Sequence, residues 1–530
     1  PGKDKGESNS YRPVSLLCPA IKILERLLLP TLNENLEIPN FQHGFRAQHS
    51  TVTALNEFNI QVSNGFGKNN PPDRTVLLQL DLSKAFDMVS LDKLIQDLDQ
   101  STLPPPIKRW FSNYLRGRQS KVHFRNSTSS KRNIRTGVPQ GAVTSPVLFN
   151  FYLRCLPIPP EGVMVVQYAD DISIYATGKN IPDLTKKIND YAKLVIDFLE
   201  ERELMVSPEK STVTLFTPDT KEYNIHPDVQ LRGKPVPLEH EPKLLGVTFN
   251  TMHTFTPHVN KTVNKAKAKV NLIKTVAGST WGQDKETLTL TYKAIGRSIL
   301  EYAVPIWSPI ISKSCWDRLQ VVQNQALRVA TGCLAMTSID HLHRETKVLP
   351  LKEHGEMLTK QFLLSCQLPG HPGNRVINTP APNRPKRKPT NLKYREEIQH
   401  LPPITDKASL KSNNKRIHTE TVQKVIANYP DNKVLNTRPP EVNDKEEISL
   451  PRTSRCLLSQ LRSGYSRKLN SYKSRIDQTI IDQCPDCGQS PHNTNHLFSC
   501  SSNPTHLTPR SLWTTPHQAA NFLNLDEGVT

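Results

Sequence analysis

The chain has 530 residues, which is room for about two to four domains whose cores need no disulfides. A formal net charge of +19 favours a polyanionic partner, most commonly nucleic acid, although a ribosomal-type scaffold or an anionic membrane surface fits the same charge. Six of the nine cysteines are isolated and no apolar run reaches about 18 residues, so neither a secreted disulfide framework nor a membrane span is expected.

The N-terminal residue is Pro1, and neither an initiator methionine nor a signal-peptide pattern is present. We therefore expect the chain to be part of a longer polyprotein. From about residue 10 to 350 the composition is globular, with apolar runs spaced as in strands and helices.

The first element that carries chemistry is a short apolar run at residues 76–80 (VLLQL), followed at once by Asp81. Residues 82–87 then have the character of a turn and a helix start. This pattern predicts a buried strand whose C-terminal end presents the Asp81 carboxylate.

Two β-rich runs follow at residues 163–168 and 172–176, separated by Ala169, Asp170 and Asp171. They predict a hairpin with two acids at its tip. Adjacent carboxylates repel unless a cation lies between them, and a third carboxylate from a neighbouring strand end would complete an oxygen-rich site suited to Mg²⁺. Taken alone, the Asp-Asp pair is more simply explained as good turn chemistry.

The next element is a helix predicted over residues 261–274, where Val263, Ala266, Val270 and Ile273 form an apolar stripe. Five lysines lie among and on either side of these apolar residues. This basic flank suits either the grip of a nucleic-acid backbone or plain exposure to solvent. The lysines are Lys261, Lys265, Lys267, Lys269 and Lys274.

Residues 369–451 differ in composition from the rest of the chain. Prolines bracket the basic cluster Arg384, Lys386, Arg387 and Lys388, and residues 371–450 contain only two aromatic residues. Such a segment cannot bury enough apolar surface to fold alone. We predict a basic, Pro-rich linker that is largely disordered, with at most one short helix.

The spacing Cys484-x₂-Cys487-x₈-His496-x₃-Cys500 has the ligand types and intervals of a closed Cys₃His zinc site. His492 can replace His496 in this pattern, and free cysteines near an unrelated histidine would leave the same spacing. We expect a small structural zinc module that binds nucleic acid, because six basic residues precede it. They are Arg455, Arg462, Arg467, Lys468, Lys473 and Arg475.

Seven segments in one order resemble the motifs of reverse transcriptases. They are residues 11–17 (YRPVSLL), 42–46 (QHGFR), 80–87 (LDLSKAFD), 137–141 (GVPQG) with 145–146 (SP), 168–171 (YADD), 204–210 (LMVSPEK) and 243–246 (KLLG). Residues 292–295, 305–307 and 319–328 are similar to the region after the palm in jockey-like non-LTR retrotransposons. The resemblance covers about residues 8–350 and the terminal cysteine cluster.

The resemblance implies an α+β fold of the right-hand polymerase kind. Its parts would be fingers (1–75), a palm with an antiparallel sheet (76–255) and a helical thumb or connection (256–368). The fingers and palm together form a reverse transcriptase domain over about 8–255. The linker (369–451), the zinc module (452–510) and a tail (511–530) would follow. The family's usual upstream endonuclease would belong to the preceding part of the polyprotein.

The resemblance also assigns the catalytic metal site. Asp81, Asp170 and Asp171 would hold two Mg²⁺ ions, with Mn²⁺ as an alternative, and the backbone of Leu82 would touch the metal. Such ions activate a primer 3′-hydroxyl and stabilise the leaving pyrophosphate. Lys210 matches the position proposed to protonate the pyrophosphate. For the structural Zn²⁺, the similar ending of jockey-like elements favours His496 over His492.

Substrate contacts follow in the same way. Phe86 matches an aromatic steric gate that excludes a ribose 2′-hydroxyl, with an ordinary core ring as the alternative. Gln140 and Gly141 belong to a loop that faces the incoming nucleotide. Arg46 and Arg12 would clamp the triphosphate, because a guanidinium fork matches phosphate oxygens. A primer grip is expected at Lys243, Leu244 and Gly246.

The sequence therefore predicts a nucleotidyltransferase, an RNA-directed DNA polymerase that extends a DNA primer with dNTPs by copying its own element's RNA. No membrane partner is expected, and the resemblance implies a ribonucleoprotein in nucleus and cytoplasm. One alternative is a decayed or domesticated copy that only binds RNA, against which the intact Asp81, Asp170 and Asp171 argue. The other is an RNA-dependent RNA polymerase, against which Phe86 and the motif order argue.

Overall fold

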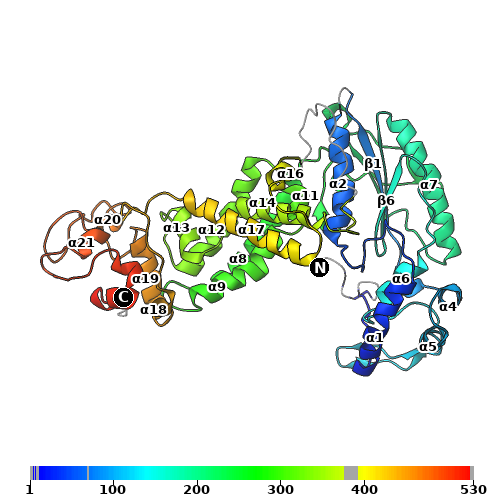
Figure 1. The fold of residues 1–530 in the computed structure, drawn as a ribbon, viewed down its shortest axis with the longest axis horizontal. Helices are drawn as coiled ribbons and strands as arrows, with labels where there is room; N and C mark the ends of the chain where they lie inside the picture. The colour runs from blue at the N-terminus through cyan, green and yellow to red at the C-terminus, as the bar shows by residue number, and fades with distance from the viewer. Residues whose placement is uncertain (1–3, 5, 8–10, 69–70, 375–391, 526–530) are drawn as a thin grey trace. The chain divides into compact units, whose positions relative to one another are not determined.

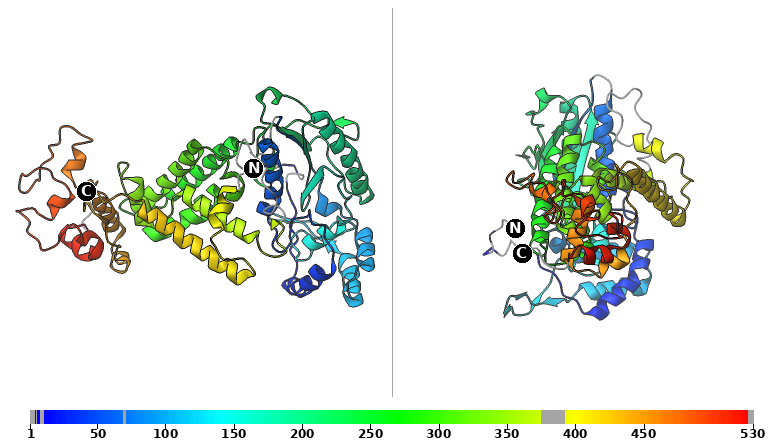
Figure 2. Two further views of the ribbon diagram at one scale, coloured as in Figure 1. Left: turned by 45° about the horizontal axis from the view of Figure 1, so that its top comes forward. Right: turned by 90° about the vertical axis from the view of Figure 1, so that its left-hand side faces the viewer.

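The computed structural model describes residues 4, 6–7, 11–68, 71–374 and 392–525. It divides into two compact units, one made of residues 1–255 and 363–407 and the other of residues 256–362 and 408–530. The first unit combines helices with an antiparallel sheet, and the second is helical, so the predicted α+β class is confirmed (Figures 1 and 2). Across the described residues, none of the helices combines the length and apolar character that a bilayer span requires.

The first unit is built on a four-stranded antiparallel sheet with the strand order β6-β7-β1-β8. The predicted strand is β1 (Arg74–Leu80), and the predicted hairpin is β6 (Val163–Tyr168) and β7 (Asp171–Gly178). Strand β8 (Thr212–Phe216) forms the edge beside β1. Both sequence predictions are confirmed, with the hairpin tip reduced to two residues because Tyr168 already pairs with Asp171.

Helices cover both faces of this sheet, which explains why β1 is an almost continuous apolar run. On one face lies α2 (Thr51–Gly67), where Phe58 meets the rings of Tyr175, Phe216 and Phe249 edge-on. On the other lies α7 (Ile181–Glu201), which buries an apolar stripe at helical spacing (Figure 1). Burial on both faces holds the strand ends, and so the acids, in fixed register.

The remaining elements of the first unit surround the sheet. The helices are α1 (Pro19–Asn35), α3 (Ala85–Met88), α4 (Leu91–Gln100), α5 (Pro105–Leu115), α6 (Ser145–Tyr152), η2 (Thr220–Glu222) and α16 (Leu392–Ile398). Short hairpins are formed by β2 (Gln119–Ser120) with β5 (Arg132–Asn133), β3 (His123–Phe124) with β4 (Ser127–Thr128), β9 (Gln230–Leu231) with β10 (Lys234–Pro235), and β11 (Lys243–Leu244) with β12 (Val247–Thr248).

The second unit begins with the predicted lysine-rich helix, α8 (Thr256–Lys274). Val263, Ala266, Val270 and Ile273 are buried as predicted, and the five lysines are exposed. Further helices follow: α9 (Lys285–Tyr292), η3 (Lys293–Arg297), α10 (Ser298–Leu300), α11 (Val304–Trp307), α12 (Lys313–Thr331), α13 (Ile339–Thr346) and α14 (Leu351–Ser365).

The stretch predicted to be a largely disordered linker contains helices. They are α16, α17 (Lys407–Ala427) and α18 (Asp444–Ile448). Within the second unit, α17 buries Ile417 and Val425, and Gln361 donates a hydrogen bond to the carbonyl of Asn414 at 3.2 Å. The prediction was wrong here because packing partners distant in sequence supply what the segment lacks. The basic cluster at residues 384–388 lies outside the described residues.

The C-terminal part of the second unit has its own apolar core around α19 (Arg452–Arg462). Leu457, Leu458 and Leu461 pack with Trp513 and Ala519, so residues expected to form a tail belong to this core. The short helices here are α20 (Asn470–Lys473), α21 (Thr494–Leu497), α22 (Ser511–Thr514) and α23 (Pro516–Phe522).

Two of the basic residues expected to bind nucleic acid are buried instead. Arg462 is fully buried and donates to Glu447 at 2.6 Å and to Glu345 at 3.1 Å. Arg455 is also buried, and its guanidinium pairs with Glu286. The expectation was wrong for these two residues because acids elsewhere in the second unit neutralise them. Arg467, Lys473 and Arg475 remain exposed.

Candidate active site

Three aspartates lie at the same end of the antiparallel sheet, where β1 ends and the chain turns from β6 into β7. Asp81 directly follows β1, whose last residue Leu80 pairs with Ile172 of β7. Asp171 is the first residue of β7, and Asp170 lies in the two-residue tip before it. Because β7 pairs antiparallel with both β1 and β6, the C-terminal end of β1 and the tip of the β6–β7 hairpin lie at the same end of the sheet. The predicted juxtaposition of the three acids therefore follows from the strand register.

The acids interact electrostatically. Desolvation by the surrounding protein, followed by the negative charges of Asp170 and Asp81, raises the pKa of Asp171 to about 6, while the Arg12 charge opposes this shift. Among the described residues, only the Cys484 cluster brings three or more potential ligand atoms within 4.8 Å of one another. The three carboxylates therefore interact through their charges, although their ligand atoms are farther apart than those of the cysteine cluster.

The hairpin tip is held in a strained backbone conformation by Gln42. The φ angle of Ala169 is +57°, in the left-handed region. The Gln42 side-chain oxygen accepts hydrogen bonds from the amides of Ala169 at 3.0 Å and Gly44 at 2.8 Å. A Cβ on Gly44 would lie 2.6 Å from the Ala169 nitrogen, so only glycine permits this approach. This role of Gln42 was not predicted, although its place in a motif of polar residues was a signal for it.

The end of β1 is fixed by the segment at residues 204–210. The amide of Ser207 donates to the Asp81 carbonyl at 2.9 Å, and that of Ser83 donates to the Met205 carbonyl at 3.0 Å. The Asp81 amide in turn donates to the Ser211 hydroxyl at 3.2 Å. Leu82, the predicted backbone contact to metal, pairs with Val206 in an isolated bridge. These bonds orient the backbone that presents the first carboxylate.

Phe86 lies on α3, just past the catalytic strand, and is half-buried. Its ring stacks on that of Phe149 with 4.3 Å between centroids and 15° between planes. The Phe86 carbonyl accepts a hydrogen bond from the Val138 amide at 3.0 Å, which joins α3 to the loop at residues 137–141. The ring is therefore fixed on one side by Phe149 and packs against the core of the first unit, while part of its surface stays exposed.

The loop at residues 137–141 depends on two glycines. Gly137 has a φ of +84°, and a Cβ there would lie 2.7 Å from the Asp87 carbonyl oxygen. Gly141 has a φ of +115°, and a Cβ there would approach the Ser15 carbonyl oxygen to 3.0 Å. Between them, the Gln140 amide donates to the Asp87 carboxylate at 2.8 Å. Gln140 is thus oriented toward α3, and Asp87 gains a partner that the sequence analysis did not foresee.

A buried glutamate binds the residues that directly follow this loop. Glu25 on α1 has no exposed surface, and its carboxylate accepts hydrogen bonds from the Val143 amide and from the hydroxyls of Thr144 and Tyr114, each at 2.9 Å. Sequence reasoning missed this residue. Its position one turn from Ile21 and two turns from Leu32, on an otherwise apolar helix face, was the available signal.

The two predicted phosphate clamps differ in their surroundings. One guanidinium nitrogen of Arg46 donates to the carbonyls of Pro39 at 2.7 Å and Gln42 at 3.0 Å, and burial lowers the pKa of this guanidinium. Its other nitrogens make no hydrogen bond to described residues. Arg12 is exposed, and its charge acts on Asp171. Arg46 is thus held in place by two backbone carbonyls, and Arg12 is an exposed cation whose charge reaches Asp171.

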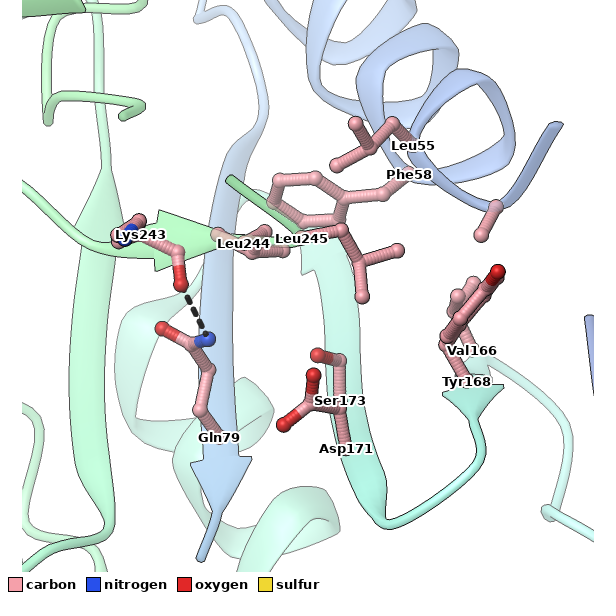
Figure 3. Close-up of a pocket in the computed structure, with 11 residues that line it drawn as sticks. Leu55, Phe58, Gln79, Val166, Tyr168, Asp171, Ser173, Lys243, Leu244 and Leu245 are labelled. Carbon is pink, nitrogen blue, oxygen red and sulfur yellow. Dashed lines mark hydrogen bonds between the residues drawn. The ribbon is translucent and has the colours of Figure 1, made fainter. Parts of the chain in front are cut away.

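A small pocket separates the sheet from the β11–β12 hairpin (Figure 3). Its wall includes Asp171 and Tyr168 on one side and Lys243 and Leu244 on the other. The Gln79 amide donates to the Lys243 carbonyl at 3.3 Å across the pocket. The tight turn of the hairpin places Gly246 at a φ of +91°. The pocket thus places Lys243 and Leu244, two of the three predicted primer-grip residues, near Asp171.

Lys210 is exposed in the turn before β8 and forms no ion pair among the described residues. Its amide donates to the Ser207 carbonyl at 3.3 Å. The ammonium group is therefore free to reach a ligand, and nothing in the fold itself requires its charge.

The predicted zinc ligands converge in the second unit. Ligand atoms of Cys484, Cys487, His496 and Cys500 all lie within 4.8 Å of one another, with 3.3 Å between the Cys487 sulfur and His496 Nε2. His492 is the alternative that the sequence left open. It does not belong to this group, and its Nδ1 accepts a hydrogen bond from the Asn470 amide at 3.1 Å. Three thiols and an imidazole are a donor set that suits Zn²⁺.

Comparisons with known proteins agree with this geometry. Residues 2–249 match the family model described as "Reverse transcriptase (RNA-dependent DNA polymerase)". The chain is 29% identical over 378 residues to the "Probable RNA-directed DNA polymerase from transposon BS" of Drosophila melanogaster, covering 68% of this chain and 40% of that protein. It is 26% identical over 406 residues to the "RNA-directed DNA polymerase from mobile element jockey" of the same organism, covering 73% and 43%. The chain thus spans less than half the length of these relatives.

Among solved structures, a telomerase from Candida tropicalis in complex with a fragment of telomeric RNA aligns with 77% of this chain and 56% of that chain. The sequence identity is 11% and the TM-score 0.36. Similarity at this level supports no inference about function.

Proposed function

We propose that the chain is an RNA-directed DNA polymerase that extends a DNA 3′ end by copying retrotransposon RNA, because residues 2–249 match a reverse transcriptase family model and the chain is similar to the polymerases of mobile elements. The proposal rests on one observation. Asp81, Asp170 and Asp171 lie at the same end of the sheet, close enough for the charges of Asp81 and Asp170 to act on Asp171. Desolvation and the neighbouring charges of Asp170 and Asp81 raise the pKa of Asp171, which indicates a cation-binding site rather than turn chemistry.

The donor set fits the expected metal. Carboxylate oxygens are the ligands that Mg²⁺ prefers, and Mn²⁺ accepts the same set. Asp81, Asp170 and Asp171 would hold two ions, with the Leu82 backbone as a further oxygen donor. When bound, the ions lower the pKa of a primer 3′-hydroxyl and neutralise charge on the leaving pyrophosphate.

The surrounding side chains would orient the substrates. Arg46, anchored through one nitrogen to two carbonyls, keeps its other donors for the triphosphate, and Arg12 adds a second cation beside Asp171. Lys210 would donate a proton to pyrophosphate. Gln140 and Gly141 would face the incoming dNTP.

The primer would lie on the other side of the acids. The β11–β12 hairpin borders the pocket beside Asp171, and we assign Lys243, Leu244 and Gly246 to the primer grip. The half-buried ring of Phe86 would lie under the nucleotide sugar. Under this proposal, the primer and the incoming nucleotide would lie around one metal site.

For the whole protein, the proposal extends to its partners and location. Copying its own element's RNA would make the chain part of a ribonucleoprotein, present in cytoplasm and nucleus. An upstream endonuclease in the same polyprotein would supply the nicked DNA 3′ end that this domain extends.

The experiment that tests the proposal is extension of a labelled DNA primer on an RNA template with the four dNTPs. Products should form with Mg²⁺, disappear with a chelator and return when Mg²⁺ is added in excess. A protein that binds the hybrid but adds no nucleotide under any divalent cation would instead be a domesticated RNA-binding protein, and the proposal would be rejected.

The cysteine cluster leads to a separate prediction. We expect the purified protein to hold about one equivalent of Zn²⁺ through Cys484, Cys487, His496 and Cys500, because their ligand atoms all lie within 4.8 Å of one another and are the types that zinc prefers. Cys487→Ser should lower the zinc content and weaken RNA binding while primer extension on a pre-bound hybrid continues. Metal analysis and RNA-binding titration measure both effects.

The matched control is Cys155→Ser, which changes an exposed lone cysteine of the first unit. It should leave the zinc content unchanged. Equal zinc contents in wild type and Cys487→Ser would remove the metal site.

A further inference from the structure

Residues 116–136, which we call the arm, form a long exposed hairpin between α5 and the loop at residues 137–141. At the base of the arm β2 pairs with β5, and toward its tip β3 pairs with β4. The Ile134 amide donates to the Arg118 carbonyl at 2.8 Å, and the Ser129 amide to the Val122 carbonyl at 2.9 Å. The arm is therefore an ordered element although its side chains contribute almost nothing to the core.

The arm carries charge of one sign only. Residues 116–136 contain seven lysines and arginines and no aspartate or glutamate. Five of the seven are exposed and form no ion pair within the part of the chain that the structure describes: Lys121, Arg125, Lys131, Arg132 and Arg135. The other two have partners, since Arg116 lies 3.6 Å from Asp92 and Arg118 donates to the Gly137 and Leu115 carbonyls. Five unneutralised cations on one projection repel one another unless a polyanion lies across them.

Exposed aromatic and apolar groups accompany this charge. The Phe124 ring is 47% exposed and meets the Tyr11 ring edge-on, with 5.1 Å between centroids. Tyr11 is 44% exposed, and Val122 beside them is 62% exposed. Rings that share a surface with free cations are the combination on which unpaired bases stack while phosphates are bound.

The arm is connected to the candidate active site at both its base and its tip. Its last residues lead directly into Gly137 of the nucleotide-facing loop. At the tip, Phe124 touches Tyr11, whose neighbour Arg12 acts on Asp171. The Ser15 amide, in the same N-terminal segment, donates to the Gln140 carbonyl at 2.7 Å. A strand bound along the arm would thus lead toward the carboxylates.

We propose that the arm binds a single-stranded polynucleotide through Lys121, Arg125, Lys131 and Arg132, with Phe124 as a stacking platform for an unpaired base. The source of that strand rests on the proposed function, under which it is the RNA template not yet paired with the product. The exposed ring favours a single strand over a duplex, whose bases are already stacked, and over an acidic protein surface, which has no bases to offer.

The test compares two variants with equal loss of charge. In the arm variant, Lys121, Arg125, Lys131 and Arg132 are changed to Gln. In the control variant, four exposed lysines on or next to α7 are changed to Gln: Lys179, Lys186, Lys187 and Lys193. Binding to a 20-nucleotide single-stranded RNA is measured without dNTPs at several salt concentrations. Each phosphate contact on a single strand contributes about −0.7 to the slope of log K against log salt. The slope of the arm variant should therefore be shallower than that of the wild type by about 2 to 3 units.

The control variant should keep the wild-type slope. Phe124→Ala should weaken single-stranded RNA binding at least about fivefold and leave duplex DNA binding unchanged, and Phe124→Tyr should restore the affinity. Equal slopes for arm and control variants would overturn the assignment. So would unchanged RNA affinity in the arm variant, which would leave an acidic protein surface as the partner. Because binding is measured without catalysis, these results do not depend on whether the wild type extends primers.

Discussion

Asp170→Asn is expected to reduce primer extension roughly 10³-fold or more, since a catalytic metal ion contributes several kcal/mol to the transition state and each 1.36 kcal/mol is a factor of ten. Affinity for an RNA–DNA hybrid should change little, because Lys and Arg contacts to phosphates dominate it. Loss of the Asp170 charge should also lower the pKa of Asp171 from about 6 in the metal-free protein. Single-turnover kinetics and a titration of the carboxyl groups measure the two effects.

The matched control is Asp190→Asn, which removes one carboxylate from an exposed position on α7 away from the sheet edge. It should keep wild-type extension. Activity of Asp170→Asn within a few-fold of the wild type would contradict the assignment of the metal site, whatever the binding data show.

Phe86→Val is expected to admit ribonucleotides. A steric gate works by excluding the larger ligand, so removal of the ring opens space for a 2′-hydroxyl without improving deoxynucleotide binding. The substitution should also lower the stability of the fold, because it removes the stacking of Phe86 on Phe149. We therefore expect a gain of about tenfold or more in UTP use relative to dTTP, with some loss of dTTP incorporation and of thermal stability. Competition between UTP and dTTP on one template measures the ratio.

Phe86→Tyr separates these effects because it keeps the ring and its stacking. It should discriminate as the wild type does. If Phe86→Val changes stability but not the UTP to dTTP ratio, the ring belongs only to the core and sugar selection lies elsewhere.

The strand and hairpin that carry the acids could be predicted from sequence because local patterns determine them. The apolar run of β1 and the two β-rich runs around Ala169 and Asp170 specify their own conformations. The predicted lysine-rich helix α8 followed from an apolar stripe at helical spacing. The pairing of β7 with β1 and β6 then brings the three aspartates to the same end of the sheet.

Residues whose role depends on distant partners could not be predicted. Glu25 supports the loop at Val143 and Thr144 from more than a hundred positions away, and nothing near it in the sequence names those partners. Arg462 looked like a nucleic-acid contact until its pairing with Glu345 and Glu447 made it part of a buried core. In the same way, α17 forms where composition predicts a disordered linker, because tertiary packing overrides local preference.

One primer-extension assay decides whether this chain synthesises DNA on RNA. Wild-type protein, poly(rA)–oligo(dT) and Mg²⁺ are incubated with dTTP or UTP, and primer lengthening is followed on a denaturing gel. We expect processive addition of dTTP, little addition of UTP and no product with a chelator. Extension with UTP as readily as with dTTP would instead identify an RNA polymerase, and no extension with either nucleotide would show that the chain is not a polymerase.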